Sequence, residues 1–418
     1  MKKILWSVMF LILFIYGCNG QSGKKRPLPI VPAIKLPAKT SAKPLYNIYV
    51  ENSGSMNGFV QSQAEFKETV GNFLADLEIN DLAKSINLNY INSTIIPIGS
   101  NIPSFINNLN PTSFISAGGK ITTTDISKML KSIIDRTGDS SVNIFISDCV
   151  FSPPKEVPAK LYLVDQQLGI KTNFANKLNS LNFTTVVLRL TARFNGTFFN
   201  CSNQTTKIDA QRPYYIWIMG KHDYIKNLFE KVDRKKFKGG GVKDFYCLNN
   251  ISIASNFAIL DSPNFQRDKK NPRTRIVNAQ KIAKGPHSGE FQISFGVNLT
   301  EALIDDDYIL NSKNYTIPSN YEIEIKNSTI TGYTHILTLT TKTLKPQILN
   351  IKLENKLPNW VLQANSEDDT QILIGNEMNK TFGIRNLIEG IFEAYLAKTP
   401  GGSSKPIFEF EISINQGS

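Results

Sequence analysis

The sequence is poor in cysteine and histidine, and this scarcity limits the metal and redox chemistry open to it. Its 418 residues include 4 cysteines and 3 histidines, and no two cysteines form a Cys-x-x-Cys pair. The histidines are scattered, at His222, His287 and His335. Zinc sites and disulfide frameworks are normally recognised by closely spaced cysteines and histidines. The composition therefore excludes a disulfide-dense fold and gives no motif for zinc.

The common catalytic motifs are also missing. The chain contains no Gly-x-Ser-x-Gly, no His-Glu-x-x-His and no Gly-x-Gly-x-x-Gly, which would indicate a serine hydrolase, a zinc protease or a dinucleotide site. Three glycines at 239–241 lack the Lys-Ser/Thr of a phosphate loop, and we interpret them as a domain boundary. Acidic triplets at 305–307 and 367–369 are typical of exposed turns, with Ca²⁺ binding as the alternative. We predict that the protein is not an enzyme.

One long apolar run stands at the start of the chain. Residues 4–16 follow Met1-Lys2-Lys3 and are shorter than the roughly 20 residues that a spanning helix needs. We therefore expect a secretory signal, with an uncleaved anchor as the alternative. The run ends in Ile-Tyr-Gly-Cys at residues 15–18, which resembles a bacterial lipobox. That resemblance implies a signal peptide over residues 1–17 and a lipid on Cys18.

The lipobox resemblance also implies a place for the protein, the bacterial cell envelope. No acidic cluster follows Cys18, so we expect an outer membrane lipoprotein that faces the periplasm. Residues 18–44 contain five prolines, a density that favours extended, semi-rigid chain, and we interpret them as a tether. The net charge is +12, but an exported chain without aromatic residues among its basic clusters is not expected to bind nucleic acid.

Oxygen-bearing side chains follow two predicted strands at their carboxyl ends. Residues 46–50 are typical of a buried strand that ends at Glu51, and Ser53 and Ser55 follow on either side of a glycine. A second buried strand, residues 142–147, is followed by Asp148. Ligands of open α/β sheets gather at the carboxyl ends of the strands, and oxygen atoms are the ligands that Mg²⁺ and Ca²⁺ select. The pattern predicts one shared cation.

These residues resemble a von Willebrand factor A domain and its metal-ion-dependent adhesion site. That family has an Asp-x-Ser-x-Ser turn, a threonine in a Gly-Gly-Thr-Asp-type loop and a later aspartate. In this sequence the turn is residues 51–55, with Glu51 in place of the first aspartate, the threonine matches Thr124, and the later aspartate matches Asp148. The resemblance covers roughly residues 45–235. It implies a doubly wound, mostly parallel α/β sheet in a domain spanning 45–238.

The same resemblance implies a metal site and a partner. Mg²⁺, or Mn²⁺ or Ca²⁺ in its place, would be held by Glu51, Ser53, Ser55, Thr124 and Asp148. Octahedral coordination of Mg²⁺ leaves one position for an outside ligand, which an Asp or Glu of a protein partner would take. Glu51 is longer than the family's aspartate and would hold the ion through water.

The pattern of apolar and polar residues changes after residue 244. Alternating strands such as 291–297 and 408–414 predict antiparallel sheet with one buried face. We therefore expect a β-rich, sandwich-like domain over 245–418, with one added helix near residues 384–395. Of the cysteines other than Cys18, Cys201 and Cys247 are the favoured disulfide pair, and three buried thiols are the alternative.

Three functions remain open at this point. The first is a lipid-anchored envelope protein whose metal site binds a protein partner. The second is a metal-independent envelope scaffold that makes its contacts through the β-rich domain. The third, which we favour least, is a metal-dependent hydrolase.

Overall fold

The structure is a computed structural model, and it describes residues 42–61, 65–119, 125–181, 183–249, 256–399 and 404–416. The predicted signal peptide, Cys18, nearly all of the tether and Thr124 lie outside these residues. Within the described ranges, no helix combines the length and the apolar character needed to cross a bilayer.

A seven-stranded mixed sheet forms the centre of the α/β part, in the order β3-β2-β1-β4-β6-β5-β7. β1 is parallel to β2 and β4, whereas the other pairings between its described strands are antiparallel. The expected parallel arrangement is thus limited to three adjacent strands, β2, β1 and β4. Segment 195–211 extends a long β5–β6 hairpin. The strands are β1 (Leu45–Glu51), β2 (Ser85–Ile91), β3 (Ile95–Gly99), β4 (Ser141–Ser147), β5 (Thr184–Phe199), β6 (Thr205–Gly220) and β7 (Val242–Leu248).

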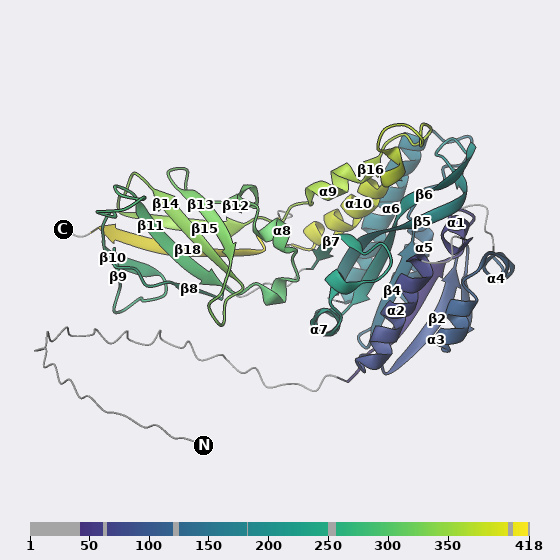
Figure 1. The fold of residues 1–418 in the computed structure, drawn as a ribbon, viewed down its shortest axis with the longest axis horizontal. Helices are drawn as coiled ribbons and strands as arrows, with labels where there is room; N and C mark the ends of the chain where they lie inside the picture. The colour runs from purple at the N-terminus through teal and green to yellow at the C-terminus, as the bar shows by residue number, and fades with distance from the viewer. Residues whose placement is uncertain are drawn as a thin grey trace, which may run out of the picture. The chain divides into compact units, whose positions relative to one another are not determined.

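Helices cover both faces of this sheet (Figure 1). Alternation along β1 explains why, because Ile48 and Val50 enter one apolar core while Tyr49 enters the other. The first core is covered by α1 (Asn57–Gln61), α2 (Glu65–Ile79), α3 (Ile102–Asn107), α4 (Pro111–Ser116) and α7 (His222–Lys231). The second is covered by α5 (Ile126–Asp135), α6 (Ala159–Ser180), α9 (Asn359–Gln363) and α10 (Ile384–Ala397).

Three asparagines fix the register of the parallel strands. Asn87, Asn47 and Asn143 are paired residues on β2, β1 and β4. The amide of Asn87 donates to Asn47 over 3.0 Å, and the amide of Asn47 donates to Asn143 over 2.8 Å. A slip by one residue would leave the buried amides of Asn47 and Asn143 without these partners. The register in turn brings the ends of β1 and β4 to the same edge.

The rest of the chain forms a two-sheet sandwich around its own core (Figure 1). One sheet has the order β12-β15-β18-β10-β9 and the other β13-β14-β11-β8. Its strands are β8 (Phe257–Ile259), β9 (Gln266–Arg267), β10 (Arg275–Ala279), β11 (Phe291–Val297), β12 (Tyr315–Thr316), β13 (Glu322–Asn327), β14 (His335–Thr341), β15 (Gln347–Leu353) and β18 (Phe408–Gln416). The short helices of this region are η2 (Thr300–Ala302), α8 (Asp306–Ile309) and η3 (Ser312–Asn314).

The chain divides differently from the expected boundary in two places. β7 joins the seven-stranded sheet beside β5, and α10, expected in the β-rich domain, packs on α6 within the second core of the α/β part. The polypeptide therefore builds most of the sandwich between β7 and α9, returns to the α/β part with α9 and α10, and then adds β18 to the sandwich. Four smaller elements complete the α/β part: η1 (Arg234–Lys236), η4 (Glu377–Asn379), and the paired strands β16 (Asn365–Ser366) and β17 (Thr381–Phe382).

Gly239 and Gly240 are tightly packed against neighbouring elements. A Cβ on Gly239 would lie 2.3 Å from the Thr69 hydroxyl, and one on Gly240 would lie 1.9 Å from the carbonyl oxygen of Thr191. Thr69 also donates to the carbonyl of Lys238 over 2.7 Å. The segment is glycine-rich because the backbone passes close to α2 and β5.

Candidate functional site

The turn after β1 places two hydroxyls next to each other. The Oγ atoms of Ser53 and Ser55 are 2.9 Å apart. The turn leads into α1, and Met56 enters the apolar core beneath it. Glu51, the last residue of β1, is fully buried and accepts a hydrogen bond from the hydroxyl of Ser147 at the end of β4.

Asp148 lies directly after β4, beside this turn. Its backbone N–H donates to the sulfur of Met56 over 3.1 Å, and its carboxylate accepts the N–H of Val150 over 3.1 Å. Burial raises the pKa of Asp148 above its ordinary value, although hydrogen bonds from Val150 and Ser55 and the charge of Arg212 act against the rise. The next residue, Cys149, has a φ of 55°, so the backbone reverses sharply here.

Arg212 of β6 brings a positive charge into the interior. The residue is only 3% exposed, and its guanidinium lies over the ring of Phe198 at 4.4 Å. Burial lowers the pKa of Arg212, and the charges of Asp148 and Asp369 oppose that shift. One of its nitrogens, Nη1, has no hydrogen-bond partner in the described part of the chain. Arg212 is therefore an internal counter-charge to two carboxylates.

Two asparagines connect the turn to the loop that precedes α5. Asn92 donates to the Asn52 side chain over 3.0 Å and to the carbonyl of Gly118 over 2.8 Å. Asn52 in turn donates to the carbonyl of Phe114 over 3.2 Å. Beyond the part of the loop that is not described, Asp125 caps α5 by accepting from the N–H of Lys128. The loop that carries Thr124 thus begins beside the turn.

The structure brings together three of the five predicted metal ligands. Ser53, Ser55 and Asp148 form one cluster of oxygen atoms, whereas the carboxylate of Glu51 accepts a hydrogen bond from the hydroxyl of Ser147, the residue before Asp148. Thr124 and the lipidation site Cys18 lie outside the described residues. Two hydroxyls and a carboxylate are the donor set of a hard cation, so the residues present fit Mg²⁺, with the positive charge of Arg212 as a competitor for Asp148.

The favoured disulfide between Cys201 and Cys247 is not formed, because both cysteines are free thiols here, as is Cys149. Cys247 on β7 is paired with Val186 near the start of β5, whereas Cys201 follows the other end of that strand. At about 3.3 Å per residue, the intervening strand separates them by roughly 40 Å, far more than a disulfide spans.

Comparison of the whole chain with models of protein families, with curated proteins and with solved structures found no match.

The sequence did not reveal Arg212 or Asp369 as part of this region. Arg212 is in a hairpin strand with no motif around it, and Asp369 belongs to an acidic triplet interpreted as an exposed turn. Asp369 is 2% exposed in the structure. Asp369 reaches the α/β part only because the chain returns there after β15. A local sequence pattern cannot predict such a long-range return.

Proposed function

We propose that this chain is a lipid-anchored cell-envelope protein whose α/β part, resembling a von Willebrand factor A domain, binds a protein partner through a divalent cation. Ser53, Ser55 and Thr124 would supply neutral oxygen ligands, and Glu51 and Asp148 would act chiefly through water. The cation would supply an electron-poor centre for a carboxylate of the partner. The observation that supports this proposal best is the meeting of Ser53, Ser55 and Asp148 at the ends of β1 and β4.

Metal binding is the first test. Purified protein is titrated with Mg²⁺ or Mn²⁺ by calorimetry, and we expect saturable binding that Asp148→Ala abolishes. Asp135→Ala is the control, because Asp135 is on α5 in an exposed ion pair with Lys131. Equal binding by the Asp148 variant and the wild type would contradict the proposal.

Partner binding is the second test. Cells are cross-linked with and without a chelator, and proteins bound to the wild type and to Asp148→Ala are compared by mass spectrometry. We expect a partner that is lost with the chelator and with the variant. A partner retained in both conditions would instead favour a metal-independent scaffold.

Cys18→Ser tests the lipid anchor, and the variant should leave the membrane fraction.

A further inference from the structure

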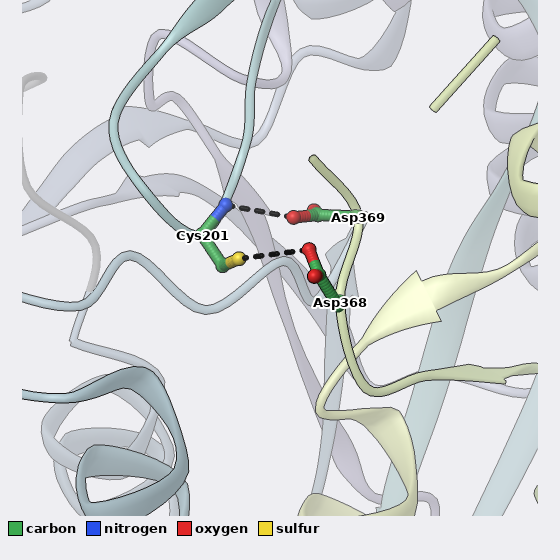
Figure 2. Close-up of side chains that lie close together, drawn as sticks. All are labelled: Cys201, Asp368 and Asp369. Carbon is green, nitrogen blue, oxygen red and sulfur yellow. Dashed lines mark hydrogen bonds between the residues drawn. The ribbon is translucent and has the colours of Figure 1, made fainter. Parts of the chain in front are cut away.

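A second group of metal-ligating side chains lies where the β5–β6 hairpin meets the segment between β16 and η4. Figure 2 shows Cys201 at the tip of the hairpin, facing Asp368 and Asp369. One ligand atom from each residue lies within 4.8 Å of the other two. The backbone N–H of Cys201 donates to Oδ1 of Asp369 over 2.7 Å, and the Cys201 sulfur is 3.8 Å from Oδ1 of Asp368.

We propose that Cys201, Asp368 and Asp369 bind a divalent metal of the zinc class. Zinc accepts both thiolate and carboxylate ligands, usually four in a tetrahedron. Bonds of about 2.0–2.3 Å place tetrahedral ligand atoms roughly 3.5 Å apart, so the sulfur and the Asp368 oxygen are already close to the required separation. The three residues leave the fourth position to water or to an outside ligand.

A carboxylate oxygen of Asp369 gives a second, independent reason to expect a ligand at this cluster. Oδ1 of Asp369 accepts from Cys201, but Oδ2 is buried and has no hydrogen-bond partner among the residues that the structure describes. A buried carboxylate oxygen without a partner is costly. A metal ion bound to Oδ2 would satisfy it and leave the Cys201 hydrogen bond in place.

The charges around the site also favour a divalent cation. Arg212 acts electrostatically on Asp369, and Asp368 lies beside Asp369 with an exposed side chain. When Cys201 is a thiolate, the cluster carries three negative charges, and Arg212 offsets one of them, which leaves two for a divalent ion to neutralise. The exposed Asp368 gives the ion a route from solvent. As the sulfur–metal bond forms, the thiol proton of Cys201 passes to water.

The thiolate distinguishes this site from the proposed Mg²⁺ site. Mg²⁺ and Ca²⁺ select oxygen ligands, whereas Co²⁺ substituting for zinc shows a thiolate-to-metal charge-transfer absorption when sulfur is bound. The full-length protein is titrated with Co²⁺ alone, and we expect this absorption to saturate at one ion per chain. It should persist in excess Mg²⁺ and disappear when Zn²⁺ displaces Co²⁺.

Variants of the three residues complete the test. Cys201→Ser should remove the charge-transfer absorption, and Asp368→Asn should weaken Co²⁺ binding by at least about tenfold, or about 1.4 kcal/mol. Cys247→Ser is the matched control, because Cys247 is a free thiol outside the cluster, and it should keep the absorption. Circular dichroism establishes that each variant is folded, with Cys201→Ala replacing Cys201→Ser if the latter is not. The proposal is overturned if the wild type shows no such absorption, or if Cys201→Ser retains it.

Discussion

At the scale of single residues, the balance of buried charge is the main feature of this protein. Glu51, Asp148 and Asp369 are all buried, and Arg212 is the one buried lysine or arginine in the described part of the chain. Burial raises the pKa of Asp148 and of Asp369, and the charge of Arg212 acts against both rises. Arg212 therefore helps to keep these carboxyl groups ionised.

Replacing Arg212 should reveal this role through its pH dependence. A buried charge that loses its counter-charge typically costs about 3–5 kcal/mol, and we expect Arg212→Met to lower the free energy of unfolding by up to that amount at pH 7 in chelator. Without Arg212, the pKa values of Asp148 and Asp369 rise further in the folded state, which then binds more protons than the unfolded chain. The loss should therefore shrink as the pH falls through those raised pKa values toward about 4, where free aspartate titrates.

The measurement is urea unfolding of the wild type and the variant across this pH range. Arg193→Met is the control, because Arg193 pairs with Asp209 on the exposed part of the hairpin, and exposed pairs contribute about 1 kcal/mol or less. A loss in Arg212→Met that is small, or independent of pH, would show that Arg212 does not balance these carboxylates.

At the scale of elements, the glycines before β7 decide how the last strand joins the sheet. A Cβ on Gly240 would lie 1.9 Å from the carbonyl oxygen of Thr191, so Gly240→Ala must displace backbone on β5 or β7. Overpacking of this kind typically costs about 1–3 kcal/mol. We expect that loss in the free energy of unfolding, measured with urea.

Gly138→Ala provides the comparison for this prediction. The nearest atom to a Cβ on Gly138 is the Ser141 hydroxyl oxygen at 3.9 Å, an ordinary contact, and its backbone is not in the left-handed region. The Gly138 variant should be as stable as the wild type within about 0.5 kcal/mol. Equal stability of the two variants would mean that the backbone at 239–241 yields freely, as a hinge would.

The elements also show what sequence can predict here. The strand that ends at Glu51, the strand before Asp148 and the helix of residues 384–395 all have strong apolar periodicity, and each is present. The pairing of β6 between β4 and β5 was not predicted, because hairpin and crossover connections leave the same apolar pattern in a buried strand. The charges near Asp148 were missed for a related reason, because Arg212 acts on Asp148 and on Asp369 only through contacts that are distant in the sequence.

At the scale of the whole molecule, the α/β part is assembled from two separated stretches of the chain. Tyr395 of α10 donates to the carbonyl of Phe183 over 2.9 Å and lies 3.0 Å from the hydroxyl of Thr185. Ile391 and Leu387 are fully buried in the same core. The sheet face that α6 covers is therefore completed only by α9 and α10, which follow sandwich strand β15 in the chain.

A fragment that ends after β7 should expose this face. We expect residues 42–249 alone to bind the dye ANS and to unfold without a cooperative transition, because the apolar side chains that contact α9 and α10 have lost their cover. Joining residues 356–399 to the fragment through a flexible linker should restore cooperative unfolding and reduce dye binding. The measurements are ANS fluorescence and thermal unfolding followed by near-ultraviolet circular dichroism. If residues 42–249 unfold cooperatively without the second stretch, then α10 covers a sheet that is already stable, and the returning segment serves mainly to carry Asp368 and Asp369 to the hairpin tip.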